Sequence, residues 1–492
     1  MRDCYYAIVA IGAIADNKVK KKMKTTNRYD FLKLAGLGVA AFGFPMLGEA
    51  AVPAKPNIIV LLIDDMGYEC IGANGCTSYK TPVIDSLAAR GVRFEHCYAQ
   101  PVCTPTRVQM MTGIYNVRNY TSFGEMDPNC VTFGNILQKA GYVTCIAGKW
   151  QLGSDLELPK KFGFDEYCLW QHTRTPPLKT AGRYANPGLE INGVVKDFTN
   201  NEYGPDIVSD YALDFIRRKK DQPFFLYYTM MLTHGPYDAT PDSADYGKAA
   251  PGARKATRPD GTNQHFSDMV EYTDKLTGKL VAKLDELGIR DNTLIIILGD
   301  NGTARGTLTM MGDRKVYGGK GQHTATAMNV PLIVSWPDKA AAGSVSRDLV
   351  DTTDFLPTVC EVAGAAVPAE LNIDGRSFLP QVRGEKGNPR SWYYSWCGDQ
   401  RLRLIVAEFA ATHDFKLSRT GDFFDLRTDL DEQHPLKAAT LTGEAAAAAE
   451  LLQGVLDRYK DARPSALAMP FTGPKVRGKK NADNANKADE NL

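Results

Sequence analysis

A pattern that recurs along the chain limits the folds it can adopt: a helical segment, a glycine, a short apolar run and then a cluster of polar residues. An apolar run without polar alternation is typical of a strand buried on both faces, as in a parallel sheet covered by helices. The runs are KPNIIVLLI at 55–63, YVTCIA at 142–147, PFFLYYTMM at 223–231, TLIIIL at 293–298 and VPLIVSWP at 330–337. The repeat predicts an α/β fold with a large, mainly parallel sheet flanked by helices.

Helix signals lie between the apolar runs. Residues 82–90 and 132–140 read as helices that each end at a glycine, and 206–219 and 350–365 read as two more. A longer amphipathic helix is predicted over 266–287, because its apolar residues recur at helical spacing. These residues are Val270, Leu276, Leu280, Leu284 and Leu287.

The composition changes near residue 386. Residues 391–430 read as short antiparallel strands and 443–461 as an Ala-rich helix, whereas the last residues are polar and almost free of large apolar side chains. A polar, charged segment of that kind is expected to be disordered. Four parts are therefore predicted: an export-signal region at 1–54, a large α/β domain at 55–385, a small C-terminal α+β subdomain at 386–470 and a disordered tail at 471–492.

The N-terminal region has the shape of an export signal. Lysines at 18–24 precede the apolar stretch LAGLGVAAFGFPML, and small residues follow at 48–54. This order is typical of a cleaved signal peptide and predicts a periplasmic or extracellular protein. Met23 begins a signal of ordinary shape, so we also interpret it as a candidate true start. Tyr29 stands where a twin-arginine signal has its second arginine, and the export route therefore stays open.

Net charge and cysteine spacing exclude several classes of protein. The chain of 492 residues has a formal charge of +1, which argues against a nucleic-acid-binding surface. Its ten cysteines show no paired C-x-x-C spacing, so no zinc motif is visible. No internal apolar run is long enough to predict a membrane span in the mature protein.

Polar residues follow the apolar runs at sites where a ligand is expected. Ligands of open parallel sheets bind beyond the carboxyl ends of the strands, so these clusters should meet at one edge. They are Asp64–Asp65, the Cys103 loop, the sequence GKWQ at 148–151, the sequence THGP at 233–236 and the sequence GDNG at 299–302.

The Cys103 loop reads CTPTR at 103–107 and precedes a predicted helix. Pro105 suits the first turn of a helix, where a missing N–H costs nothing. Cys103 is then placed beside the unpaired N–H groups at the helix N-terminus, where an anion is stabilised. Arg107, one turn later, faces back toward it. A plain buried thiol is the alternative interpretation of Cys103.

Six motifs occur in an order that resembles the sulfatase family of the alkaline-phosphatase superfamily. They are KPNIIVLLIDDMGY, CTPTRVQMMTG, AGKWQLG, THGPY, LGDNGT and GGKG. The resemblance covers residues from about 56 to 430 and makes 55–385 the catalytic domain of an alkaline-phosphatase-like fold. It also implies that Cys103 is converted to formylglycine by a separate maturation enzyme.

The resemblance implies a site for one divalent cation. Its ligands would be Asp64, Asp65, Asp300, Asn301 and the modified Cys103. Hard oxygen ligands of this kind suit calcium, with magnesium as the alternative. The lack of histidine in the set disfavours a two-zinc phosphatase.

The resemblance further implies a hydrolytic role for several side chains. Formylglycine at position 103 would be the nucleophile, held by Arg107. Lys149 and Lys320 would bind sulfate oxygens and neutralise the charge of the transition state. His234 would contact the sulfate ester and protonate the leaving oxygen.

The chain departs from the family pattern at three places. Thr106 stands where serine or alanine is usual, and residues 325–327 replace acidic and glycine residues. Gln151 stands where the family has a histidine thought to help release sulfate, and glutamine cannot titrate. We interpret both Gln151 and His323 as substrate-binding candidates, with His323 as the substitute for the missing histidine; a solvent-facing loop histidine is the alternative.

Three functions remain open from the sequence. The first is an exported sulfatase acting on a sulfate ester, expected on a sulfated carbohydrate. The second is a phosphonate or phosphodiester hydrolase of the same superfamily. The third is a non-catalytic glycan-binding relative, to which Gln151 and Thr106 lend weight.

Overall fold

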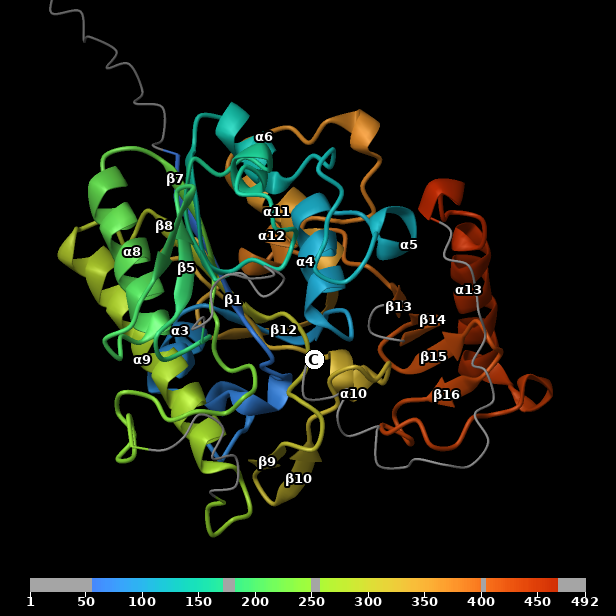
Figure 1. The fold of residues 1–492 in the computed structure, drawn as a ribbon. Coiled ribbons are helices and arrows are strands. Elements are labelled where there is room, and N and C mark those ends of the chain that lie inside the picture. The colour runs from blue at the N-terminus through green and yellow to red at the C-terminus, as the bar shows by residue number, and fades with distance from the viewer. Residues whose placement is uncertain (1–54, 171–181, 249–256, 400–403, 468–492) are drawn as a thin grey trace, which may run out of the picture. The chain divides into compact units, whose positions relative to one another are not determined.

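The computed structural model describes residues 55–170, 182–248, 257–399 and 404–467 (Figure 1). The predicted export-signal region at 1–54, with its alternative start at Met23, lies outside these residues, as does the predicted tail at 471–492. No helix of the described segments combines the length and the hydropathy needed to cross a membrane.

A ten-stranded sheet forms the centre of the large part of the fold. Its strands lie in the order β12-β2-β11-β8-β1-β7-β3-β4-β5-β6. Their bounds are β1 (Asn57–Ile63), β2 (Val92–Tyr98), β3 (Val143–Lys149), β4 (Glu166–Trp170), β5 (Gly188–Ile191), β6 (Val194–Asp197), β7 (Phe224–Thr229), β8 (Thr293–Gly299), β11 (Leu332–Ser335) and β12 (Ser344–Asp351). The central strands β8, β1, β7, β3 and β4 are parallel, whereas β11, β5 and β6 run antiparallel to their neighbours. The predicted α/β fold is confirmed.

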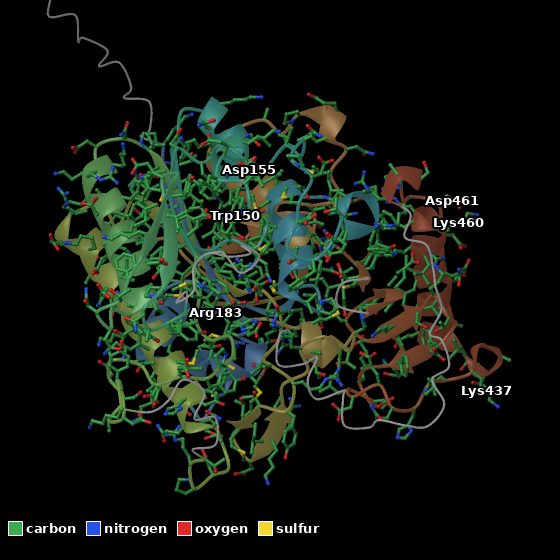
Figure 2. All side chains as sticks on the ribbon, viewed as in Figure 1. Trp150, Asp155, Arg183, Lys437, Lys460 and Asp461 are labelled. Atoms are coloured by element: carbon green, nitrogen blue, oxygen red, sulfur yellow. The ribbon has the colours of Figure 1, made fainter. Side chains whose placement is uncertain are left out.

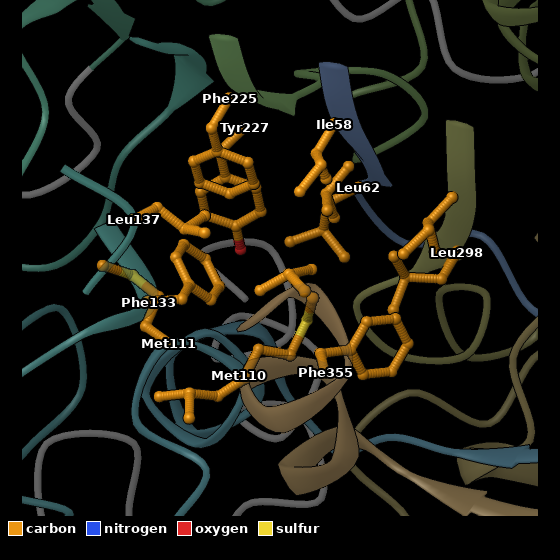
Figure 3. Packing of buried hydrophobic residues seen from close by; sticks show 14 of the residues in the cluster. Ile58, Leu62, Met110, Met111, Phe133, Leu137, Phe225, Tyr227, Leu298 and Phe355 are labelled. Carbon is orange, nitrogen blue, oxygen red and sulfur yellow. The ribbon is translucent and has the colours of Figure 1, made fainter. Parts of the chain in front are cut away.

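The apolar runs are explained by burial on both faces of the sheet. All seven residues of β1 are buried, with Ile58 and Leu62 in one hydrophobic cluster and Ile59 and Leu61 in the other. Each fully buried side chain of this size contributes about 1.5–3 kcal/mol. Figure 3 shows the first cluster, in which strand side chains such as Ile58 pack toward those of the covering helices.

Helices cover both faces of the sheet (Figure 1). The first cluster is closed by α4 (Cys103–Thr112), α6 (Phe133–Lys139), α11 (Phe355–Val362) and α12 (Leu379–Val382). The second cluster is closed by α3 (Pro82–Ala89), α8 (Gly204–Lys219) and α9 (Gln264–Glu286). Short helices α5 (Asn116–Asn119), α7 (Leu158–Lys161) and α10 (Ala325–Met328) and the hairpin β9 (Leu308–Met311)–β10 (Arg314–Tyr317) lie in the connections.

Capping residues set the ends of several predicted helices. Helix α6 begins after Thr132, which forms a capping box with Asn135, and α9 begins after Asn263, whose side chain accepts from the amide of Phe266. The helix predicted over 350–365 is wrong in its first third. Residues 344–351 form β12 and pair with β2, and the α-helix begins only at Phe355.

The small C-terminal sheet has the antiparallel order β13-β14-β15-β16. Its strands are β13 (Tyr393–Asp399), β14 (Leu404–Ala411), β15 (Phe415–Ser418) and β16 (Phe423–Asp425), and α13 (Gly443–Tyr459) packs on it through Leu452 and Leu456. The predicted sheet and helix are confirmed. The division into a domain at 55–385 and a subdomain at 386–470 stays a prediction, and a buried ion pair joins Arg390 to Asp354 across it.

Candidate active site

The polar clusters predicted at the strand ends lie at the carboxyl edge of the sheet. Asp64 follows β1, Lys149 is the last residue of β3, and Asp300 follows β8. Cys103 is the first residue of α4, after β2, and His234 follows β7. The fold therefore brings to one edge residues that are up to 236 positions apart in the sequence.

Carboxylates and the thiol of Cys103 form the centre of this edge. One atom each of Asp64, Cys103 and Asp300 lie within 4.8 Å of one another, and the same holds for Asp64, Asp65 and His234. The backbone amide of Asp65 donates to Asp300 Oδ1 at 3.1 Å, with Asp65 in the left-handed region at φ 59°. All of these residues are buried.

Asn301 joins the carboxylates through one half of its amide. Its Nδ2 donates to Asp65 Oδ1 at 2.8 Å and to the carbonyl of Gly302 at 2.9 Å. Its Oδ1 is buried and has no hydrogen-bond partner among the described residues. A buried unpaired oxygen is costly unless a ligand satisfies it. Three carboxylates and one free amide oxygen form a hard donor set, and the residues present therefore fit a calcium or magnesium ion.

Buried cationic side chains pair with these carboxylates. Lys149 Nζ lies 2.7 Å from Asp64 Oδ1, and Lys320 Nζ lies 2.9 Å from the carboxylate of Asp65. Arg107 donates to Asp300 Oδ2 through Nη2 at 2.7 Å and through Nε at 3.2 Å. A buried charge is costly unless it is paired, so these contacts keep the cluster charged.

The local charges move several pKa values. Burial raises the pKa of Asp300 to about 6, and the neighbouring Asp64 adds to the rise. Burial also acts to raise the pKa of Asp64, but Lys149, His234 and two arginines outweigh it and hold that pKa well below its usual range. Burial lowers the pKa of His234 well below its ordinary value, and nearby cations add to the effect.

The local backbone fixes Lys149 at the end of β3. Gly148 has φ 120°, and a Cβ at this position would lie 1.7 Å from the carbonyl oxygen of Thr229. Only glycine permits this close approach of β3 and β7. The carbonyl of Lys149 in turn accepts from Thr229 Oγ1 at 2.7 Å and from Arg107 Nη1 at 3.1 Å. The backbone of Lys149 is thereby tied to the Arg107 side chain.

Thr106 closes the turn that carries Cys103. Its Oγ1 accepts from the amide of Gln100 at 2.9 Å and lies 3.3 Å from the carbonyl of Val102. The hydroxyl therefore fastens the first turn of α4 to the loop that precedes it. The departure at Thr106 keeps a hydroxyl at a position where the fold uses one.

Gln151 and His323 lie in different surroundings. Gln151 is buried with φ 58°, and its Oε1 has no partner among the described residues. His323 has a pKa lowered to about 4 by burial and by Lys416, whose Nζ donates to the His323 carbonyl. In the described segments, Nδ1 of His323 has no hydrogen-bond partner. The substitution of His323 for the family histidine that Gln151 replaces stays a prediction.

Arg183 is a member of the cluster that the sequence did not indicate. Its Nη1 lies 3.3 Å from Asp64 Oδ2. In the sequence it lies between β4 and β5, within the stretch 170–205, where arginine, tyrosine and aspartate occur without a readable pattern. No apolar strand run directly precedes it, so the signal that indicated the other residues is missing here.

Residues 325–327, the third departure from the family pattern, form the start of helix α10. Thr324 caps this helix, and its side chain accepts from the amide of Ala327. Ala325 and Ala327 are buried, and Ala325 and Thr326 line a neighbouring cavity of about 330 Å³. The small side chains here thus serve packing.

Comparison with known proteins shows the same family along most of the chain. The family model described as Sulfatase matches residues 56–365, and the model described as N-sulphoglucosamine sulphohydrolase, C-terminal, matches 319–452. N-acetylgalactosamine-6-sulfatase from Canis lupus familiaris is 31% identical over 398 residues, which are 74% of this chain and 73% of the relative. Arylsulfatase A from Homo sapiens is 29% identical and matches 69% of this chain and 70% of the relative.

Solved structures share the fold. The crystal structure of Ps i-CgsB in complex with k-i-k-neocarrahexaose has a TM-score of 0.67 and 25% identity, and the match covers 83% of this chain and 94% of that chain. The structure of BT4656 in complex with D-glucosamine-2-N,6-O-disulfate has a TM-score of 0.66 and 22% identity, covering 83% and 98%. The second likeness, at its low identity, is one of fold.

Proposed function

The chain belongs to the sulfatase family of sulfuric ester hydrolases, and from this premise we propose that it removes a sulfate group from a sulfated carbohydrate. The observation that carries the proposal is the cluster of Asp64, Cys103 and Asp300, with lysines and arginines packed around it. Relatives named N-acetylgalactosamine-6-sulfatase and the complex of a structural neighbour with k-i-k-neocarrahexaose support the carbohydrate as substrate.

We propose that Cys103 is present as formylglycine, made by a maturation enzyme, and that one divalent cation completes the site. Asp64, Asp65, Asp300 and the Oδ1 of Asn301 would hold the cation together with position 103. Calcium fits this oxygen set, with magnesium as the alternative. A cation lowers the pKa of an oxygen nucleophile and offsets the charge of the sulfate, and formylglycine supplies such an oxygen in its hydrated form.

Each side chain of the cluster would have its own role in binding the sulfate group or stabilising the nucleophile. Arg107, bound to Asp300 and to the Lys149 carbonyl, fixes the first turn of α4 and stabilises the nucleophile. Lys149 and Lys320 would bind sulfate oxygens and offset the charge that builds up in the transition state. Both are buried, and a buried charge acts more strongly than one in water.

His234 is the candidate contact to the ester oxygen. Its Nδ1 lies 2.5 Å from the carbonyl of Gly235, and its Nε2 lies 3.7 Å from Asp65 Oδ2. The first contact orients the ring and leaves Nε2 directed into the cluster. With Nδ1 donating to that carbonyl, Nε2 carries a proton only in the imidazolium form, which the negative charge of a bound sulfate ester favours. Protonation of the leaving sugar oxygen from that form is the role that we propose.

Gln151 would add a hydrogen bond to the substrate, since its Oε1 is buried without a partner in the described segments. The proposed location is periplasmic or extracellular, in keeping with the signal-like N-terminus. A phosphonate or phosphodiester hydrolase and a non-catalytic glycan-binding protein are the alternatives that an assay must separate.

The test is co-expression with a formylglycine-generating enzyme, followed by mass analysis of the tryptic peptide that ends at Arg107. We expect the mass of an aldehyde at position 103 and release of sulfate from sulfated sugars, with none from a Cys103→Ala control. Faster turnover of aryl phosphodiesters or phosphonates than of sulfate esters would point to the first alternative. A persistent thiol together with glycan binding and no turnover would point to the second.

A further inference from the structure

Arg183 is a buried cation in contact with the centre of the cluster. Only 8% of its surface is exposed, and its Nη1 lies 3.3 Å from Asp64 Oδ2. In Figure 2 its label stands in the middle of the large α/β part, whereas Lys437 and Lys460 lie at the periphery. Arginine is seldom fully buried, because removing its charge from water is costly unless an anionic group pairs with it. The buried position of Arg183 therefore requires a partner for its charge.

The fold holds the guanidinium of Arg183 in a fixed place. Its Cζ atom lies 4.2 Å from the ring centroid of Trp170, a cation–π contact at the end of β4. The next residue, Tyr184, accepts from the amide of Gly204 at 2.7 Å and donates its hydroxyl to the carbonyl of Met231 at 3.1 Å. A side chain anchored in this way loses little entropy when it binds a ligand.

Asp64 alone does not account for Arg183. Lys149 already pairs with Asp64 Oδ1 at 2.7 Å, and Arg107 Nη2 lies 3.8 Å from the same oxygen. Among the described residues, Nη1 of Arg183 donates to Asp64 Oδ2 at 3.3 Å, and the hydroxyl of the adjacent Tyr184 is a second hydrogen-bond partner of the guanidinium. An arginine has five N–H donors arranged to match two oxygens of an oxyanion. Most of the N–H donors of the Arg183 guanidinium are thus left for another acceptor.

The charge of the cluster also calls for an anion. Four cationic side chains meet the three carboxylates of Asp64, Asp65 and Asp300 among the described residues. They are Arg107, Lys149, Arg183 and Lys320. The excess is positive before any cation is added, and a divalent cation on the carboxylates would enlarge it. Since buried charge is costly when unbalanced, the cluster favours a bound anion.

Arg183 also lies next to the histidine of the site. One atom each of His234, Asp64 and Asp65 lie within 4.8 Å of one another, and Arg183 contacts the same Asp64 carboxylate. Its guanidinium is therefore close both to the Asp64 carboxylate and to the residue proposed to contact the ester oxygen.

We propose that Arg183 is a substrate-binding residue whose guanidinium holds oxygens of the sulfate group. The inference rests on the proposed function, because it assumes that the anion in this site is a sulfate ester or the sulfate product. Gln151 has no charge and cannot bind the anion as a cation would. The inference therefore assigns part of the anion binding to Arg183, a residue outside the family motifs. Trp170 acts through Arg183 and is a positioning residue.

The test is a calorimetric titration of inorganic sulfate into the full chain, matured at position 103 and kept at saturating calcium. Arg183→Lys keeps the charge and loses the fork, and Arg183→Ala loses both. We expect sulfate to bind about 10- to 100-fold more weakly to Arg183→Ala, the range for a hydrogen bond between charged groups. The loss should be smaller for Arg183→Lys. Calcium affinity, titrated separately, should stay within a few-fold of the wild type.

Arg390→Lys is the matched control, since Arg390 is equally buried and is paired with Asp354 away from the cluster. It should bind sulfate like the wild type. Unchanged sulfate binding in Arg183→Ala would overturn the inference and leave Arg183 as a counter-ion of Asp64. Failure of the wild type to bind sulfate would overturn it as well. Sulfate release from sulfated sugars is assayed separately, and its absence would count against the proposed function alone.

Discussion

At the scale of the residue, Thr106 shows how a departure from a motif can be accommodated. Its buried hydroxyl accepts from the amide of Gln100, on the loop before Cys103. Thr106→Val keeps the shape and removes the acceptor, so a buried N–H is left unpaired. The free energy of unfolding in urea should fall by about 1–3 kcal/mol. Thr106→Ser keeps the hydroxyl, and its free energy of unfolding should fall by less. Equal losses of unfolding free energy in the two variants would show that packing of the methyl group dominates.

The residues of the site differ in how readily the sequence indicates them. Asp64, Lys149 and Asp300 each end or follow an apolar run, and parallel strands bring such ends together at one edge, so their neighbourhood was predictable. Arg183 follows no such run and meets Asp64 across 119 positions. Its place depends on Trp170 and on the segment that Tyr184 fastens to Gly204. Contacts of this kind are made by the folded chain and leave no periodicity in the sequence.

At the scale of the element, Asp274 of α9 caps helix α3 and should give stability a measurable pH dependence. It accepts from the amides of Val83 and Ile84 at 3.1 and 2.8 Å. Burial raises its pKa to about 6, and these two hydrogen bonds act against the rise. The unfolded chain releases this proton near pH 4, so the folded state binds more protons between about pH 4 and 6. The stability from this group is present at low pH and is lost as the pH rises through about 6.

Asp274→Asn has no proton to lose and isolates this contribution. The difference in unfolding free energy, wild type minus variant, should fall by about 2–3 kcal/mol from pH 4 to pH 7, as expected for a pKa shift of about two units. Urea unfolding of both proteins at a series of pH values measures it. Curves that stay parallel across this window would contradict the assigned pKa.

The small C-terminal sheet holds the loop that follows Lys320. Lys416 of β15 donates to the carbonyl of His323 and pairs with Glu432, and Glu432 Oε1 accepts from the amide of Ala325 at 2.6 Å. Glu432→Ala leaves the buried ammonium of Lys416 without its counter-charge and should cost about 3–5 kcal/mol of unfolding free energy. The double variant Lys416→Met/Glu432→Ala should cost less than the single one. A larger, additive loss in the double variant would show that the pair has no internal coupling.

The sequence predicted these strands but could not predict this contact. Alternation and turn residues indicate β13 to β16 one by one, and the structure confirms the antiparallel sheet. The helix predicted over 350–365 failed for a related reason, because residues 344–351 are fixed as a strand by β2, far away in the chain. The local sequence pattern predicts the type of most helices and strands here. Pairing with distant strands determines where an element ends and which residues it contacts.

At the scale of the whole molecule, one sheet edge gathers the charges of segments that are otherwise distant. Strands β1, β3, β7 and β8 and helix α4 each deliver a residue there, and the C-terminal sheet fixes the loop after Lys320. Gathering four cationic side chains and three carboxylates in a buried cluster has a desolvation cost in folding free energy that their mutual pairing only partly offsets. A ligand that binds this edge should therefore stabilise the entire chain.

Calcium is expected to provide that stabilisation. An ion that binds only the folded state adds about 2.7 kcal/mol at a concentration 100-fold above its Kd, so the Tm in calcium should exceed that in EDTA by a few degrees. Asn301→Ala removes the unpaired Oδ1 and should lower the calcium-induced rise. Asn57→Ala deletes an equally buried asparagine at the opposite end of β1 and should leave the rise intact. Equal Tm values in calcium, magnesium and EDTA would show that these oxygens do not form a cation site.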